Sequence, residues 1–261
     1  MTHSRPRQPH PAALPPFQTL LDNTDWALLA TACGTGESLP AALALLTNPD
    51  PLIRESALQD ALEPVTHQNS IYEATVPVAL YVAAILNHPA VTPSDYSHDA
   101  KTGPNRPTLV RLLEWLGDTA YDANDDCVAV DGHLHGEGVL DEHEAMRAFR
   151  DARPAIFSAV HALLCHDSAG VRHTALVAAI PLAEHPHLTQ HQVALAGHGR
   201  RLLATSTDRY HRDRVLDALK AWGHDTSGSE NASDIAAREH YARLRAARAS
   251  WNGGYSEDPP F

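Results

Sequence analysis

The apolar positions of residues 38–62 recur at intervals that predict two short helices joined by a tight turn. Three leucines spaced by four and three residues share one face of the first helix: Leu39, Leu43 and Leu46. An Asn-Pro-Asp-Pro turn follows, in which Asp50 is typical of a helix N-cap and Pro51 of a first helical position. The second helix carries its own apolar face, made by Ile53, Ala57, Leu58 and Ala61. Because two short helices cannot bury both faces alone, we expect further copies of the pair to stack on this one.

Four arginines indicate where those copies lie. Each has a large apolar residue four positions later, and the four are Arg54, Arg111, Arg172 and Arg212. The last two are about 40 residues apart, which is the length of one helical pair in arrays of this kind. The two longer gaps require inserted segments, which we expect to be loops. One lies at about 89–107 and is rich in Pro, Ser, Asp and Gly, and the other lies at about 118–140 and is polar and acidic.

The remaining segments complete an all-α organisation. Residues 1–13 are predicted to be disordered, and a leading cap helix through Trp26 and Cys33 opens a helical-repeat domain over 14–223, with about four helical pairs. A flexible linker at 224–233 precedes a C-terminal helix and aromatic tail at 234–261. This helix is either a detachable interaction arm or an end cap that packs three apolar residues on the last pair: Ile235, Tyr241 and Leu244.

Three segments resemble the helical units of bacterial HEAT-repeat proteins: residues 39–62, 162–186 and 208–223. In that family a proline lies early in the first helix, an aspartate lies at the turn and an arginine begins the second helix. Pro40, Asp50 and Arg54 match all three features. The second segment shifts the aspartate by one position, and the third lacks the proline; their matching residues are Asp167, Arg172, Asp208 and Arg212.

The resemblance implies a fold and a general function. The expected fold is a right-handed α-α superhelix, a HEAT-like solenoid, with curved layers of helices. HEAT arrays act as scaffolds that grip other proteins or, in basic members, nucleic acid. Several bacterial helical-repeat proteins of this size resemble toxin-neutralising immunity proteins or assembly factors. The matching residues are structural, so the resemblance itself selects none of these roles.

Charge narrows the class of partner. The net charge is −12, from 20 basic and 32 acidic residues, which favours a basic protein over nucleic acid or an anionic membrane. A HEAT-like nucleic-acid-binding or DNA-repair protein is a second alternative, with a basic patch beside Trp222 at Arg200, Arg201, Arg209, Arg212 and Arg214. The cysteines are scattered, and no apolar run is long enough to span a bilayer, so we expect a cytoplasmic protein with reduced thiols.

The acidic segment from Asp118 to Glu144 contains the strongest candidates for metal chemistry. His133, His135 and Glu137 alternate, and on an extended segment such side chains point the same way, toward one Zn²⁺, Mn²⁺ or Fe²⁺. A metal-dependent enzyme that uses this loop, with Asp131 as a further ligand, is therefore the first alternative function. The spacing of Asp122, Asn124 and Asp126 imitates a calcium loop, but Cys127 and His133 stand where glycine and a bidentate glutamate are needed.

No nucleophile motif and no phosphate-binding loop is present in the sequence, so we predict no catalytic residues and no cofactor other than this divalent metal. The predicted function is a non-catalytic protein-binding scaffold of HEAT-repeat type that neutralises or chaperones a basic partner. Its predicted contacts lie on the second helices and the acidic segment: Arg54, Arg111, Asp122, Asp125, Asp126, Asp131 and Arg212. Glu55 and Glu114 share the second-helix surface, and the polar connector at 67–72 serves either hydrogen bonding between repeats or recognition.

Overall fold

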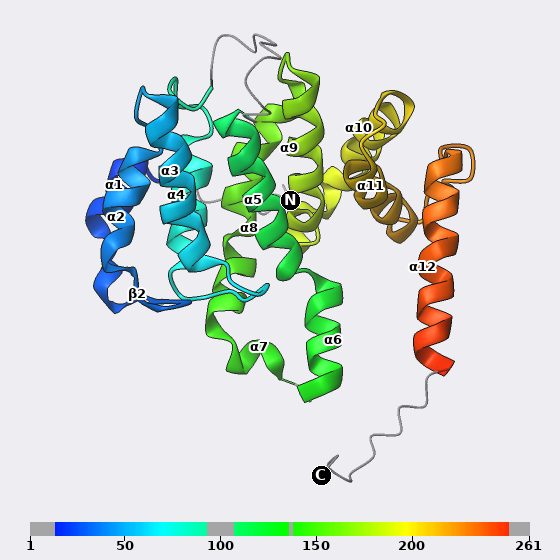
Figure 1. Ribbon diagram of the computed structural model, residues 1–261, viewed down its shortest axis with the longest axis horizontal. Helices are drawn as coiled ribbons and strands as arrows, with labels where there is room; N and C mark the ends of the chain where they lie inside the picture. Colours follow the sequence, from blue (N-terminus) through cyan, green and yellow to red (C-terminus); the bar gives the residue numbers. More distant parts are fainter. Residues whose placement is uncertain (1–13, 93–106, 136–137, 251–261) are drawn as a thin grey trace, which may run out of the picture. The chain divides into compact units, whose positions relative to one another are not determined.

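The computed structural model describes residues 14–92, 107–135 and 138–250. The fold is all-α: the described residues lie mostly in helices, with one antiparallel pair of two-residue strands, β1 (Ala30–Thr31) and β2 (Gly34–Thr35). The chain divides into two compact units, residues 1–198 and residues 199–261, and each is described by itself (Figure 1).

The first unit contains nine α-helices in its described part. They are α1 (Phe17–Asn23), α2 (Leu39–Leu45), α3 (Pro51–Leu62), α4 (Thr75–Ile85), α5 (Thr108–Asp122), α6 (Asp125–His135), α7 (Val139–Glu142), α8 (Glu144–Ala162) and α9 (Ala169–Leu182). Short 3-10 turns connect them at Trp26–Leu28, Gly36–Ser38, Glu63–Val65, Leu163–Cys165 and Pro186–His191. The next helix, α10 (Gln192–Thr205), crosses the boundary between the two units.

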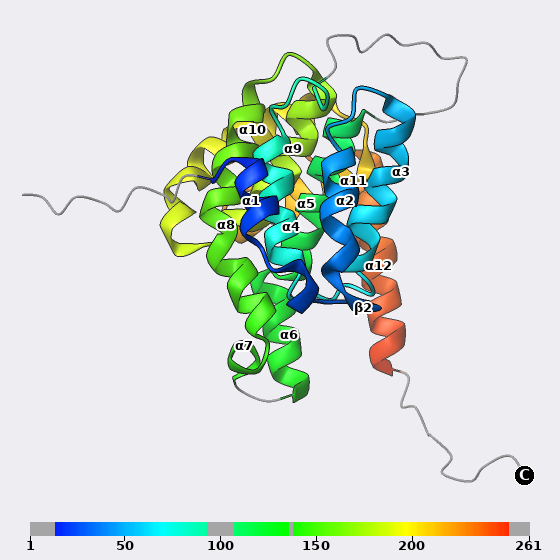
Figure 2. The same ribbon diagram turned by 90° about the vertical axis from the view of Figure 1, so that its left-hand side faces the viewer.

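Two layers of helices bury the core of the first unit. Helices α3, α5 and α9 lie side by side in one layer, and α4 packs against α1 and α8 in the other (Figures 1 and 2). The pairs α2–α3, α4–α5 and α8–α9 join the layers, and the Tyr81 hydroxyl on α4 donates to the Leu43 carbonyl on α2 at 3.0 Å. Helices α5 and α9 approach each other closely, since a Cβ on Gly117 would lie 3.1 Å from Ala178 Cα.

The predicted first helical pair is present as α2 and α3. Asp50 caps α3 by accepting the Leu52 N–H at 2.9 Å. The three leucines of the first helix are buried, as are Ala57, Leu58 and Ala61 of the second. Ile53 is 39% exposed, so the prediction of its burial is wrong. The leading cap helix is also misplaced: the helix is α1, and residues 30–35 form the strand pair.

The expected loop at 118–140 is mostly helical. Helix α5 extends to Asp122, and α6 begins at Asp125 because the buried Asn124 side chain accepts the Cys127 N–H at 2.7 Å. Asp125 and Asp126 occupy the first turn of α6, where carboxylates are favoured by the helix dipole. Most of the other predicted insert, 89–107, lies outside the described residues, as do residues 1–13 and 251–261.

The second unit contains the end of α10, then α11 (Arg209–Ala221) and α12 (Ala232–Ser250). Gly223, at φ +80°, ends α11 with two hydrogen bonds, from its own N–H to Lys220 O and from His224 N–H to Leu219 O, both at 2.9 Å. Among the side chains of α12 that the structure describes, residues 232–247, those of Asp234 and Ala237 are buried. Ile235, Tyr241 and Leu244 are exposed, so the prediction that they pack as an end cap is wrong.

Candidate binding face

Arg54 and Arg172, the first and third members of the arginine series, close the turns of their helical pairs. Nη1 of Arg54 donates to Asn48 O at 2.6 Å and to Pro49 O at 2.9 Å, and its Nε donates to Thr108 Oγ1 at 3.2 Å. Arg172 repeats this arrangement with His166 O and Asp167 O, at 2.6 and 2.7 Å. These contacts satisfy carbonyls that follow a helix end. Because Arg54 is only 8% exposed and is used in this way, its predicted role as a partner contact is wrong.

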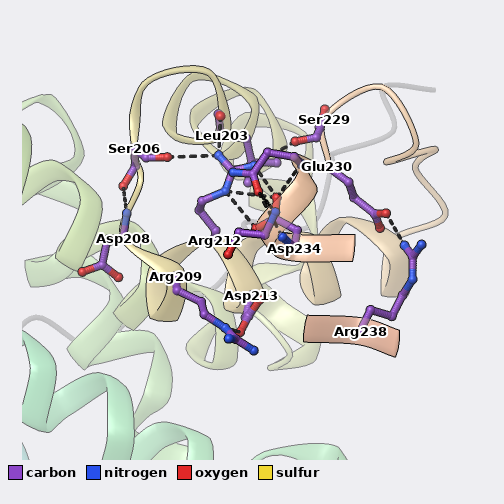
Figure 3. A network of polar contacts seen from close by, with 12 residues as sticks. Leu203, Ser206, Asp208, Arg209, Arg212, Asp213, Ser229, Glu230, Asp234 and Arg238 are labelled. Carbon is purple, nitrogen blue, oxygen red and sulfur yellow. Dashed lines mark hydrogen bonds and ion pairs between the residues drawn. The ribbon is translucent and has the colours of Figure 1, made fainter. Parts of the chain in front are cut away.

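Arg212 lies in a buried network of the second unit (Figure 3). Its Nη2 is 2.6 Å from Asp234 Oδ2, its Nε donates to the same carboxylate at 3.1 Å, and each of the two side chains is 3% exposed. Carbonyls of Leu203, Ser206 and Ser229 accept its remaining N–H groups. Hydrogen bonds from Arg212 hold the pKa of Asp234 below its usual value. The predicted partner contact at Arg212 is therefore wrong, since the side chain joins α11 to α12.

Arg111 lies in a groove of about 680 Å³ between α3 and α5 in the first unit. Four carboxylates share the lining with this single guanidinium: Glu55, Glu63, Glu114 and Asp118. Arg111 forms an ion pair with Glu55, which leaves the groove with an excess of negative charge. Trp115 also lines the groove, with its indole N–H donated to Thr66 Oγ1 at 3.1 Å, and Leu52 is 73% exposed at its edge.

The acidic side chains continue along α5. Glu114, Asp118 and Asp122 are spaced by four residues and therefore lie on one face of the helix. Like charges at this spacing destabilise a helix by about 0.2–0.5 kcal/mol per pair. We refer to the groove and these three residues as the acidic face. Acidic side chains thus follow α5 from the groove to its C-terminal end.

At the C-terminal end of α5 the acidic face ends in a pocket of about 470 Å³. Loop residues 69–71, the end of α5, α6 and the start of α8 all contribute to its lining. Asp122 and Asp126, two of the predicted contact residues, lie together in its wall. Two residues at the start of this loop have a left-handed backbone conformation, Gln68 at φ 52° and Asn69 at φ 59°. This conformation costs roughly 1–2 kcal/mol for a residue with a side chain.

Asp125 lies outside this pocket lining and forms an ion pair with Arg150. Nη1 of Arg150 also donates to Ala123 O at 2.6 Å, and the buried Arg153 donates to the same carbonyl. Oε2 of Glu184 accepts the Asp125 N–H at 2.9 Å, and the same oxygen lies 3.6 Å from Nη1 of Arg153. Burial lowers the pKa of Arg153 to about 10 and raises the pKa of Glu184. This network fixes the corner between α5 and α6.

Sequence reasoning missed Arg150, Arg153 and Glu184. The available signal was the pair of arginines three residues apart, directly after a long acidic segment. Such a pair falls on one helix face and suits the carbonyls and carboxylates of a neighbouring helix end. Their partners lie roughly 25–60 residues away in the chain, so spacing alone identifies none of them.

The metal prediction depended on an extended segment, and the structure places His133 and His135 on helix α6. Side chains two residues apart on a helix diverge by about 200°, so the reason for expecting these imidazoles to converge is wrong. The side chains of Asp131 and His135, and all of Glu137, lie outside the described parts. Among the described side chains, no group of three His, Cys, Asp or Glu is placed to hold a metal ion. A metal-dependent enzyme stays an untested alternative.

Comparison of the chain with protein-family models, curated sequences and solved structures found no match. The resemblance to HEAT repeats therefore stays a prediction from the residues that carry it. Within the described ranges, no helix combines the length and apolarity needed to cross a bilayer.

Proposed function

We propose that this chain is a non-catalytic scaffold of HEAT-repeat type that binds a basic protein through its acidic face. Two features support the repeat architecture. The second helices of successive pairs, α3, α5 and α9, lie side by side, as they would in a right-handed α-α superhelix. Arg54 and Arg172 close their turns through the same pair of main-chain contacts, which is what a structural repeat requires.

The observation that carries the binding role is the groove between α3 and α5. An excess of carboxylates beside an indole ring and an exposed leucine combines charge with apolar contact area. Negative potential of this kind steers a basic protein toward the surface and raises its association rate. The apolar groups then supply the buried anchor that a stable interface needs. Neutralising or chaperoning such a partner is the function that this surface suits.

The test compares three immobilised proteins exposed to a native lysate: wild type, a groove variant and a surface control. Glu63→Lys with Asp118→Lys changes the groove, and Asp60→Lys with Asp167→Lys makes the same charge change at exposed positions outside its lining. We expect wild type and the control to retain one basic protein that the groove variant releases. The affinity for that protein, once purified, should fall as salt is raised. Equal recovery on all three proteins, or no basic protein on any of them, would refute the proposal.

A further inference from the structure

The pocket at the end of α5 has the size and lining of a site for a single side chain or small ligand. Its volume of about 470 Å³ lies within the usual range for ligand pockets, which are mainly apolar with a few polar groups. Ile71, Val130 and Met146 provide apolar walls, and the Tyr121 ring adds an aromatic surface. The charged side chains in its wall are the carboxylates of Asp122 and Asp126, alongside the imidazole of His143.

The charge and the apolar walls of the pocket determine which class of ligand it can bind. Two carboxylates attract a cation and repel an anion, while the apolar walls suit an alkyl chain rather than a hydrated metal ion. An ammonium or guanidinium group on an aliphatic stem fits both properties.

Contacts within the protein hold the wall of this pocket in place without a ligand. Asn124, which is 3% exposed, caps α6, and two arginines hold Ala123 O at the corner between Asp122 and Asp126. The carboxylates are therefore positioned by the fold, which reduces the ordering cost of binding. We propose that this pocket receives an arginine or lysine side chain of the basic partner. The inference rests on the proposed function and gives it an anchor point at the end of the acidic face.

The test uses two peptides that differ by one charged group. The first is acetyl-Gly-Gly-Arg-Gly-Gly-amide, and the second replaces arginine by citrulline, which has nearly the same shape but no charge. Binding to the full chain is followed by NMR titration. It is also followed by the alkylation rate of Cys127, a residue of the pocket lining, in a Cys33→Ser, Cys165→Ser background. We expect the arginine peptide to slow alkylation and to bind at least tenfold more tightly than the citrulline peptide.

Variants separate the pocket from its surroundings. Asp122→Asn with Asp126→Asn should weaken the arginine peptide at least tenfold, whereas Glu142→Gln, an exposed change outside the pocket lining, should leave its affinity unchanged. If the double variant fails to fold, Val130→Arg offers a second route. Val130 is 60% exposed, so the new guanidinium is tolerated by the fold and competes with the peptide within the pocket.

Each outcome decides between the two proposals. Equal binding of both peptides, or full binding to the Asp122 and Asp126 variant, would overturn the pocket inference. Binding of agmatine with no binding of the peptide would also overturn it, because the site would then belong to a free small cation. A basic protein retained by the pocket variant but lost by the groove variant would leave the proposed function standing without this anchor. Arginine peptide binding, with no basic protein captured from lysate, would instead remove the scaffold function.

Discussion

Replacement of Asp234 by alanine tests what holds the C-terminal helix in the second unit. The Asp234 carboxylate accepts three contacts from the Arg212 guanidinium (Figure 3). It also accepts the Asn231 N–H at 2.8 Å. Removing one member of a buried ion pair costs about 3–5 kcal/mol, because the other charge is left uncompensated. Arg212 keeps its three carbonyl acceptors, so we expect the lower end of this range, about 3 kcal/mol. Loss of the Asn231 contact adds about 1 kcal/mol, since it forms half of a capping box.

Hydrogen exchange measured by mass spectrometry reports this change locally. In Asp234→Ala we expect the amides of α12 to lose their protection while those of α11 and of the first unit keep theirs. Urea unfolding gives the free energy, and Glu239→Gln, at an exposed carboxylate of the same helix, serves as a control that changes stability by less than about 0.5 kcal/mol. The double variant Arg212→Met, Asp234→Leu should recover part of the loss, because neither charge then remains buried.

A loss of less than about 1 kcal/mol in Asp234→Ala, with α12 still protected, would show that the ion pair contributes little. The dependence of stability on pH in the acid range gives an independent check of the Arg212–Asp234 ion pair. The pKa of Asp234 is depressed in the folded state by hydrogen bonds from Arg212, so the unfolded chain binds the proton more readily. The stabilisation is therefore complete above the ordinary aspartate value of 3.8 and is lost as pH falls through the depressed value. Asp234→Asn should not show this loss.

Three further changes test other parts of the fold. Gly117→Ala should destabilise the first unit by about 1–3 kcal/mol in thermal unfolding, because its Cβ would meet the α9 backbone at 3.1 Å, and unchanged stability would contradict the close helix contact. Gly223→Ala should cost about 1–2 kcal/mol in urea unfolding through its positive φ, whereas Gly228→Ala, whose Cβ meets open space, should cost less. Burial and the neighbouring His191 lower the pKa of His161, so stability should fall as pH drops from about 7 to about 5, and this fall should be smaller in His161→Gln, as measured by the melting temperature.

Periodicity in the sequence was sufficient for the all-α class and for the first helical pair. The spacing of Leu39, Leu43 and Leu46 and the cap at Asp50 depend on contacts within a few residues, and the structure contains both. The arginine series located equivalent positions, but spacing does not reveal whether a guanidinium faces solvent or a carbonyl. Arg54 and Arg212 were therefore assigned to the surface although each is buried against main-chain oxygens.

The acidic segment failed as a loop prediction for a different reason. Its composition is typical of a solvated connector. In the structure, however, the Asn124 side chain caps α6, and two distant arginines bind Ala123 O at the corner between α5 and α6. The two contact residues that meet in the pocket, Asp122 and Asp126, come from different helices, α5 and α6. No sequence interval distinguishes that arrangement from four residues within a single helix. The break at Ala123 and Asn124, where the arginine contacts to Ala123 O are tertiary, places them on two helices that share one pocket wall.

The distribution of charge agrees with the binding role proposed for the acidic face. Residues 1–198 contain 23 acidic and 10 basic side chains, whereas residues 199–261 contain 9 and 10. The carboxylates that build the fold do so through specific partners, as Asp234 does with Arg212 and Asp125 with Arg150. Glu114, Asp118 and Asp122 repeat like charges along one helix, and that repulsion lowers its stability. A basic partner offsets that repulsion on binding, so the same residues that weaken the isolated helix would strengthen the complex.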